Sequence, residues 1–169
     1  WGQVNSIELS AHDPGRAFLA VTRYKFDDFR PWIFRTNDYG ATWQLLTSGS
    51  NGIPQNHFVR VVREDPDHRG LLFAGTEFGL YASLDDGANW LSFQQNLPIT
   101  PVTDLAVKQQ DLVVATQGRS FWILDDLTPL HQLTQELKES TMKMLEPRAG
   151  YRFGGGFSFD GEGSAGQNP

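Results

Sequence analysis

The side chains best suited to chemistry are gathered in residues 23–31, RYKFDDFRP, which combine cations, two adjacent carboxylates and three aromatic rings. Aromatic rings offer flat apolar faces, and carboxylates and arginines form strong hydrogen bonds. Such a set could stack on a sugar and hold its hydroxyl groups. Two other readings stay open, namely a surface loop with scattered ion pairs and a hard cation held by Asp27 and Asp28.

Side chains of the same kinds recur farther along the chain, close to turn residues. We predict a ligand-binding set made of Tyr24, Asp27, Asp28, Arg60, Glu77, Phe78, Asp104 and Arg119. Glycoside hydrolysis needs two carboxyl groups facing each other across a cleft. The candidates for such a pair are Asp27, Asp28, Glu77 and Asp104. Their separation depends on the fold, so no catalytic residue is assigned, and neither a metal nor a cofactor is expected.

A repeated eight-residue motif indicates which elements position these residues. The pattern S/T-x-D-x-G-x-x-W occurs at residues 36–43 and again, 47 residues later, at residues 83–90. The Asp can accept hydrogen bonds from its own turn, the Gly permits positive φ, and the Trp covers the hairpin with a large apolar face. We interpret the motif residues as structural: Thr36, Asp38, Gly40, Trp43, Ser83, Asp85, Gly87 and Trp90.

This motif resembles the Asp-box, or bacterial neuraminidase repeat, of sialidases, sortilin-type receptors and xyloglucanase-like glycoside hydrolases. In those families the box is part of the fold and lies away from the reacting groups. Stretches along the whole chain, from RPWIFRTNDYGATW to the terminal GQNP, are similar to the last blades of large bacterial proteins labelled "glycosyl hydrolase, BNR repeat". The resemblance implies a β-propeller. One departure is Gln117, where a His is expected before Gly118 and Arg119.

Turn residues between short apolar stretches predict an all-β chain, a partial β-propeller of about three antiparallel blades. The expected units cover about residues 1–47, 48–96 and 97–147, followed by a Gly-rich linker at 148–169. Propellers have about four to eight blades, so we expect a fragment whose ring is completed by further blades or by a second chain. In the first unit, strands are expected at residues 4–9, 17–22, 32–35 and 43–46.

The third unit departs from the repeat after its third strand. Residues 112–126 match residues 72–86, but Leu127 stands where Gly87 would be expected. In place of the Asp-box, Thr128 and Pro129 predict a short helix that extends to about residue 138. Residues 141–145 are the candidate for the missing outer strand.

The expected topology also separates two faces. In a four-stranded up-and-down blade, the loop between the second and third strands lies at the opposite end from the Asp-box turn. The segments expected on the face away from the Asp-boxes are residues 23–31, 48–56, 77–79, 97–101 and 117–120. Matching the apolar residues of the first strands aligns Arg60 with Asp104, so we expect these two side chains to approach each other across the wall of the central channel.

Composition narrows the classes of function. The net charge is −6, from 14 Lys and Arg against 20 Asp and Glu, and there is no basic run. This argues against nucleic acid and anionic membranes as partners. The chain has no Cys, which excludes disulfides and thiolate metal sites. The apolar runs are too short to span a membrane as a helix.

Two hypotheses for function follow. The first is a glycan- or protein-binding scaffold that is not catalytic by itself, with a glycan or a peptide as ligand. The second is a part of a xyloglucanase-like glycoside hydrolase whose active site is completed by other blades. The resemblance implies an extracellular, periplasmic or cell-surface location.

Overall fold

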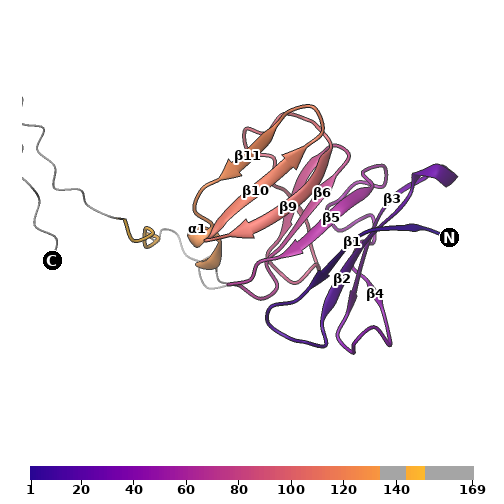
Figure 1. Ribbon diagram of the computed structural model, residues 1–169, viewed down its shortest axis with the longest axis horizontal. Coiled ribbons are helices and arrows are strands. Elements are labelled where there is room, and N and C mark those ends of the chain that lie inside the picture. The colour runs from indigo at the N-terminus through magenta and orange to yellow at the C-terminus, as the bar shows by residue number, and fades with distance from the viewer. Residues whose placement is uncertain (134–143, 151–169) are drawn as a thin grey trace, which may run out of the picture.

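The computed structural model describes residues 1–133 and 144–150, which form three antiparallel sheets and one short helix (Figure 1). Sheet 1 contains β1 (Gln3–Leu9), β2 (Ala17–Arg23), β3 (Asp28–Thr36) and β4 (Gln44–Leu45). Sheet 2 contains β5 (Val59–Glu64), β6 (Leu72–Thr76), β7 (Gly79–Ser83) and β8 (Leu91–Ser92). Sheet 3 contains β9 (Val102–Lys108), β10 (Asp111–Thr116) and β11 (Phe121–Leu124). The prediction of an all-β chain with successive antiparallel sheets is confirmed.

The helix α1 (Thr128–His131) follows sheet 3 and has a proline in its first turn, as the sequence predicts. Residues 134–138, the rest of the predicted helix, lie outside the described residues. The same holds for residues 141–143 of the predicted outer strand, while Met144 and Leu145 are described and form no strand. The described part of the chain contains no helix that is long and apolar enough to cross a membrane.

The first strands of the three sheets, β1, β5 and β9, lie side by side (Figure 1). Each of them skips one residue in its pairing with the second strand, at Asn5, at Arg60 and at Thr103. The irregularity aligns Arg60 with Thr103, so the predicted match of Arg60 with Asp104 is wrong by one residue. The reason is that Val61 and Val62 are both buried, and an apolar pattern on both sides of a strand fits two registers equally well.

Two apolar layers hold the sheets together. Phe18, Ala20 and Ile33 of sheet 1 pack against sheet 2 in the first layer, where the buried partners include Val62, Leu72 and Trp90. The other side of sheet 2 packs against sheet 3 in the second layer. Every residue of β6 and β7 is therefore buried, which explains why these strands read as continuous apolar runs.

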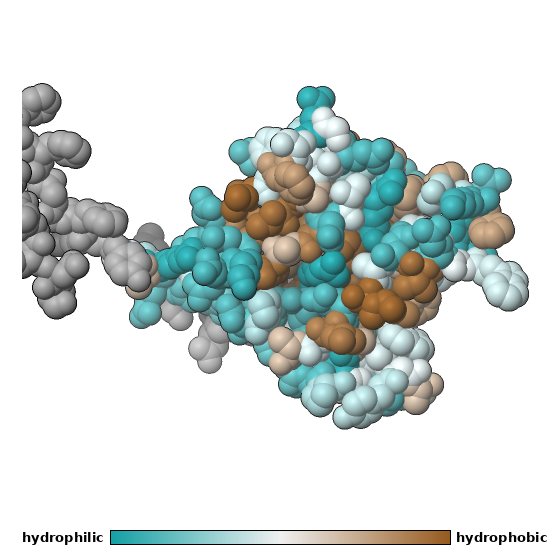
Figure 2. Space-filling view, in the orientation of Figure 1, coloured by the Kyte–Doolittle hydropathy of each residue, from teal (hydrophilic) through white to brown (hydrophobic). Residues whose placement is uncertain are grey.

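The outer faces of sheets 1 and 3 are apolar but exposed. In Figure 2, hydrophobic side chains gather over sheet 1 and over β10 and β11. Ile7 and Leu9 of β1 and Phe121 and Ile123 of β11 are among the exposed apolar residues. Ile7 and Leu9 line an apolar hollow of about 280 Å³ together with Trp43. Sheets 1 and 3 thus carry apolar surface that the described residues leave open to solvent.

Both repeated motifs form the same hairpin. Asp38 Oδ1 accepts a hydrogen bond from the backbone N–H of Thr42, and Asp85 Oδ1 accepts one from that of Asn89, both at 2.8 Å. Ser83 Oγ donates to Asp85 and accepts the N–H of Gly87. The hydrogen bonds expected within these turns are therefore present.

Candidate functional site

The hairpin of residues 23–31 differs from the expected long loop. β2 extends to Arg23 and β3 begins at Asp28, so the turn comprises the short 3-10 helix η1 (Tyr24–Phe26) and Asp27. Asp27 closes this turn with φ 57°, a conformation that Asp tolerates better than most residues. The third strand was expected to start at residue 32, but β3 starts at Asp28. Its first residues project beyond the buried part of sheet 1, so they do not alternate between buried and exposed positions, and the sequence pattern that marks a strand is missing there.

The hairpin lies at the end of the sheets that the topology predicts. Asp27 and Arg30 share an open depression of about 750 Å³ with Gln55 and Asn56, which belong to the crossing between sheets 1 and 2. In sheet 3, the backbone N–H of Gln117 donates to the carbonyl of Pro101. Loops from all three sheets thus meet crossing segments at this end, and the Asp38 and Asp85 turns lie at the other.

Aromatic rings join sheet 1 to sheet 2 beside this depression. Tyr24 stacks on Phe58, with ring centroids 5.1 Å apart and planes inclined by 20°. Phe29 also contacts Phe58, at 6.3 Å. Phe26, Phe29 and Tyr24 are partly or largely exposed, whereas Phe58 is buried beneath them. We refer to Tyr24, Phe26, Phe29 and Phe58 as the aromatic cluster.

Three members of this cluster, Phe26, Phe29 and Phe58, are absent from the predicted ligand-binding set. Phe58 lies directly before β5, which begins at Val59. A sequence signal for it existed, since His57 and Phe58 place two rings directly after a Pro- and Gly-rich crossing.

Arg60 and Glu77 form an ion pair next to the cluster. Arg60 Nη2 lies 2.6 Å from Glu77 Oε2, and the guanidinium lies over the Phe58 ring at 5.3 Å. Phe78 packs against the His57 ring at 4.6 Å. This arrangement brings an arginine, a carboxylate and aromatic rings from the predicted set together on one surface.

His57 and Tyr81 form a neutral pair below Phe78. His57 Nδ1 and the Tyr81 hydroxyl are 2.8 Å apart. Burial lowers the pKa of His57 and raises the pKa of Tyr81. Both shifts favour the uncharged side chains, and the imidazole of this pair packs against the Phe78 ring.

Asp28 is bound by two arginines rather than open to a ligand. Arg30 Nε and Nη2 donate to the two oxygens of Asp28 at 2.8 and 2.9 Å, and Arg23 Nη1 lies 3.1 Å away. Among residues 1–133 and 144–150, no group of three or more His, Cys, Asp or Glu side chains is arranged to hold a metal ion. Because arginines already fill the Asp28 oxygens, the geometry does not favour the interpretation of a cation held by Asp27 and Asp28.

The Asp28 carboxylate should stay ionised at pH 3. The hydrogen bonds from Arg30 hold its pKa at about 2, whereas an aspartate in a short peptide titrates at about 3.9. A lowered pKa stabilises the fold above pH 4, and this contribution is lost as the pH falls from about 4 towards 2. Carboxyl ¹³C NMR titration measures the value directly. In Arg30→Met, the Asp28 pKa should move up towards the ordinary value, and an unchanged titration in this variant would contradict the assigned cause.

Asp104 and Arg119 lie apart from the aromatic cluster. Arg60 and Asp104 line one hollow of about 260 Å³, in agreement with the expectation that these side chains approach each other. They do not bind each other in the structure, because Asp104 accepts a hydrogen bond from Arg63 Nη2 at 2.8 Å and Arg60 binds Glu77. Arg119 has an exposed side chain in the loop between β10 and β11. The structure thus brings six of the eight predicted residues to one region, all except Asp104 and Arg119.

Arg63 links the first strands of all three sheets. It donates to Glu8 of β1 at 3.2 Å, and to the backbone carbonyl of Leu105 in β9 at 2.8 Å, besides its bond to Asp104. Burial raises the pKa of Glu8, although Arg63 opposes the shift. The sequence gives no local signal for Glu8 or Arg63, because both lie within strands and the charged partners of Arg63 are 41 or more residues away in the chain.

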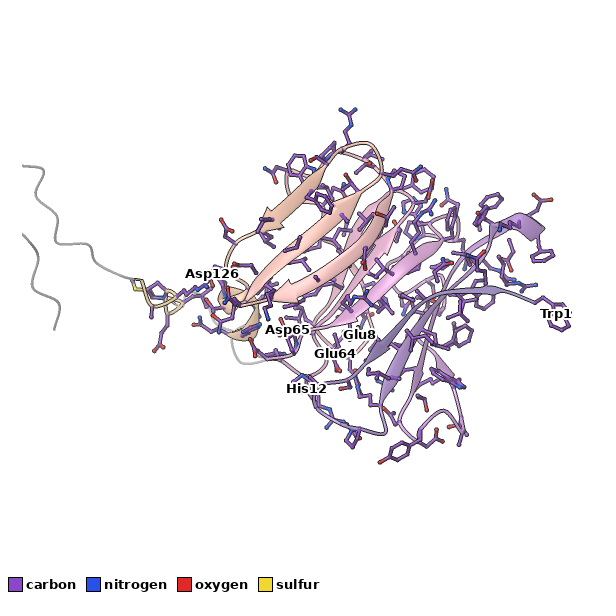
Figure 3. The ribbon with its side chains drawn as sticks, in the orientation of Figure 1. Trp1, Glu8, His12, Glu64, Asp65 and Asp126 are labelled. Carbon is purple, nitrogen blue, oxygen red and sulfur yellow. The ribbon has the colours of Figure 1, made fainter. Side chains whose placement is uncertain are left out.

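A second charged network lies at the end of the sheets that carries the Asp38 and Asp85 turns, and Figure 3 labels its members Glu64, Asp65 and His12. Arg16, from the turn before β2, lies 3.1 Å from Glu64 at the end of β5, and both side chains are buried. Arg16 and Arg35 also bind Asp86, in the turn of the second motif. Nearby, the buried Asp65 binds His131 of α1 at 2.9 Å, and its carbonyl contacts His12 at 2.8 Å. These contacts hold the sheets together and face away from the aromatic cluster.

No protein-family model matches this chain. A xyloglucanase from Paenibacillus sp is 35% identical over 94 residues, and the match covers 52% of this chain and 9% of that protein. The chain therefore spans less than a tenth of the length of this curated relative.

Solved structures share the fold at low sequence identity. The GH74 enzyme of Niastella koreensis superposes with a TM-score of 0.57 at 17% identity, over 73% of this chain and 21% of that chain. An ancestral GH74 enzyme gives 0.55 at 19% identity, over 70% and 14%. YCF48 bound to D1 peptide gives 0.51 at 17% identity, over 73% and 37%. These neighbours are β-propellers, and the three sheets of this chain match a section of such a propeller.

Proposed function

We propose that this chain is a section of an Asp-box β-propeller that serves as a glycan- or protein-binding scaffold, with a glycan as the ligand that its surface fits best. The observation that carries this proposal is the aromatic cluster. Tyr24, Phe26 and Phe29 expose ring surface beside a depression of about 750 Å³. Exposed rings in a shallow depression suit the apolar faces of sugar rings.

The polar groups around the cluster support the same ligand. Glu77 and Arg60 are about 70% shielded from solvent, and their bond leaves other carboxylate and guanidinium positions free for hydroxyl groups. Arg23, Arg30, Asp27 and Asp28 line the depression itself, where the two positive charges balance the two negative ones. Because the charges balance in both groups, the surface favours an uncharged polyhydroxylated ligand over a strongly anionic one.

The exposed outer faces support the view that further blades, in the same protein or a second chain, complete a ring. Trp43 and Trp90 occupy the same motif position, yet Trp43 is 40% exposed and Trp90 is 2% exposed. Trp90 is buried because sheet 1 covers it. We propose that another blade covers Trp43 in the same way. The proposal also includes a relationship to sortilin-type and BNR-repeat proteins. It divides the chain into blade units at about 1–47, 48–96 and 97–147, followed by a linker at 148–169. It places the protein in an extracellular, periplasmic or cell-surface location.

A second candidate function is favoured by the match to a xyloglucanase. In this alternative the chain is part of a glycoside hydrolase whose active site other blades complete. The carboxylates Asp28, Glu77 and Asp104 are each bound to an arginine here. The hydrogen bonds from Arg30 lower the pKa of Asp28, so this carboxylate is better suited to accepting hydrogen bonds from sugar hydroxyls than to donating a proton.

Removing the Tyr24 ring should weaken glycan binding at least tenfold. Calorimetric titration with xyloglucan oligosaccharides, with mannan and polygalacturonate fragments as comparison, would measure the Kd of the full chain and of Tyr24→Ala. A tenfold change corresponds to about 1.4 kcal/mol, within reach of one stacked ring. The matched control is Tyr39→Ala, because Tyr39 is more exposed than Tyr24 but lies in the first Asp-box turn at the opposite end.

Three outcomes of this experiment would count against the proposal. Equal Kd values for wild type and Tyr24→Ala would remove the aromatic cluster from the site, and an equal loss in Tyr39→Ala would show that the effect is not local. Release of reducing sugar by the chain itself would favour the hydrolase instead.

A further inference from the structure

The first strands of the three sheets share one irregularity, which brings three polar side chains to the same hollow. Asn5, Arg60 and Thr103 are the residues that β1, β5 and β9 skip in their pairing with the second strands. All three line the hollow of about 260 Å³ on these first strands. A skipped residue re-aims its side chain, and such bulges are frequent beside functional sites. Three bulges at one hollow therefore mark it as a candidate binding site.

The hollow contains hydrogen-bonding groups that are open to a ligand. Ser6 Oγ accepts the backbone N–H of Val62 at 3.3 Å, which leaves its hydroxyl hydrogen able to donate. Asp104 Oδ1 accepts hydrogen bonds from Arg63 Nη2 and from the backbone N–H of Leu105, both at 2.8 Å. Asp104 Oδ2 has no partner in the part of the chain that the structure describes, so a donor and an acceptor are both available.

The charges around the hollow disfavour an anionic ligand. Arg60 is bound to Glu77, and Arg63 is bound to Glu8 and Asp104, so two guanidinium groups stand beside three carboxylates. A carboxylate or phosphate group of a ligand would approach a net negative charge there. A hydroxyl group, in contrast, can both donate and accept without adding charge.

Arg60 joins this hollow to the aromatic cluster. Its guanidinium lies over the Phe58 ring, 5.3 Å from the centroid, and Tyr24 stacks on the same Phe58. Arg60 binds Glu77 through Nε and Nη2, so Nη1 is open among the described residues. A ligand that stacks on Tyr24 can therefore continue past Arg60 into the hollow.

We propose that this hollow is a second subsite for the glycan, which receives one uncharged sugar unit while the aromatic cluster holds another. The inference rests on the proposed function and specifies its ligand class, an oligosaccharide long enough to reach both places. Ser6 and Asp104 bind hydroxyl groups of the unit in the hollow. Arg60 stands between the two units and donates to the ligand through Nη1.

The subsite exists only where the three sheets meet. Asn5 and Ser6 come from β1, Arg60 comes from β5, and Thr103 and Asp104 come from β9. The skipped residues set the register at which these side chains meet. A ligand in the hollow therefore contacts all three sheets at once.

Filling the hollow with a large side chain tests the subsite. Thr103 lines the hollow and is exposed, and its hydroxyl donates to the carbonyl of Ala115 at 3.2 Å. Thr103→Phe therefore occupies the hollow without removing a buried side chain, and Phe suits a strand. The matched control is Ala106→Phe, because Ala106 is an exposed residue of the same strand and does not line the hollow.

The full chain would be titrated with xyloglucan fragments of two and of seven sugar units, and the NMR shifts of backbone amides would give each Kd. In the wild type, the longer fragment should bind at least tenfold more tightly and should shift the amides of Ser6 and Thr103. Thr103→Phe should remove most of this difference, while the Kd of the shorter fragment stays within twofold. Ala106→Phe should leave both Kd values unchanged.

Asp104→Asn tests the same subsite without a change of volume. The amide oxygen can still accept the N–H groups of Arg63 and Leu105, but the open carboxylate oxygen is lost. The Kd of the longer fragment should rise at least threefold, and that of the shorter fragment should stay the same. Thermal unfolding of each variant shows that it is folded.

The outcomes distinguish a failure of this inference from a failure of the proposed function. If neither fragment binds the wild type, both fail together. If the two fragments bind equally well, or if Thr103→Phe and Ala106→Phe affect the longer fragment alike, the hollow is not a subsite, although the aromatic cluster still binds a glycan. Tighter binding of the longer fragment without shifts at Ser6 and Thr103 would also overturn the inference, because its further units would then lie elsewhere.

Discussion

Replacing Arg16 with methionine should lower the free energy of unfolding by about 3–5 kcal/mol, the usual cost of leaving one buried charge without its partner. Arg16 is 3% exposed and Glu64 is 4% exposed. The substitution removes the cation from Glu64, whose remaining hydrogen bond comes from the backbone N–H of Gly70 at 3.1 Å. It also removes one of the two arginines bound to Asp86. Urea denaturation followed by circular dichroism would measure the loss.

The chain supplies a matched control for this prediction. Arg69 and Asp13 join the same two sheets, but they are 3.8 Å apart and exposed to solvent. Arg69→Met should therefore change stability by no more than about 0.5 kcal/mol. Adding Glu64→Gln to Arg16→Met should recover part of the loss, because an uncharged amide oxygen can still accept the Gly70 N–H. Equal effects of Arg16→Met and Arg69→Met would show that the buried network does not hold the sheets together.

Replacing Trp90 with alanine should cost about 3–5 kcal/mol, the range for removing a large buried aromatic side chain. Trp90 packs in the apolar layer between sheets 1 and 2, where its neighbours in the layer include Phe18 and Ile33. Loss of the indole would leave a cavity that the surrounding strands can fill only in part, since their backbone is held by ladder hydrogen bonds. Thermal and urea unfolding of the variant would measure the cost.

Trp43→Ala is the control that distinguishes the stability contributed by the motif hairpin from the stability contributed by burial of the Trp between two sheets. Trp43 donates its indole N–H to the carbonyl of Gly40 at 3.1 Å and keeps much of its ring in solvent. The same substitution in the same motif should therefore cost about 1 kcal/mol in this chain. If both variants lost the same stability, the contribution of the motif would be local to the hairpin, and the contact between sheets would add nothing.

Some of the structure follows directly from sequence because the contacts that form it are local. The hydrogen bonds of Asp85 reach a residue four positions away, and a two-residue turn between apolar stretches leaves few alternatives to a hairpin. The sequence could therefore predict three antiparallel sheets, a short helix with Pro129 in its first turn, and the end of the molecule at which each loop lies.

Register and partner choice could not be predicted in the same way. The alignment of Arg60 with Asp104 failed because β5 is buried on both sides, and the skipped residue that sets its register leaves no mark in the apolar pattern. As a result Arg60 binds Glu77, and Arg63 takes Asp104. The extent of the Tyr24 hairpin was missed for a related reason, since β3 continues past the core where no burial alternation exists.

The sequence by itself determined the elements of this protein, because turn residues, short apolar runs and the repeated motif act over distances of a few residues. The tertiary structure alone decided which of those elements meet. It places Phe58 beneath Tyr24, and it buries Arg16 against Glu64 and Asp86, a residue 70 positions away. An arginine before a strand carries the same local signal whether its partner is a distant carboxylate or water. Only the packing of one sheet against the next removes the water and gives each charge its partner.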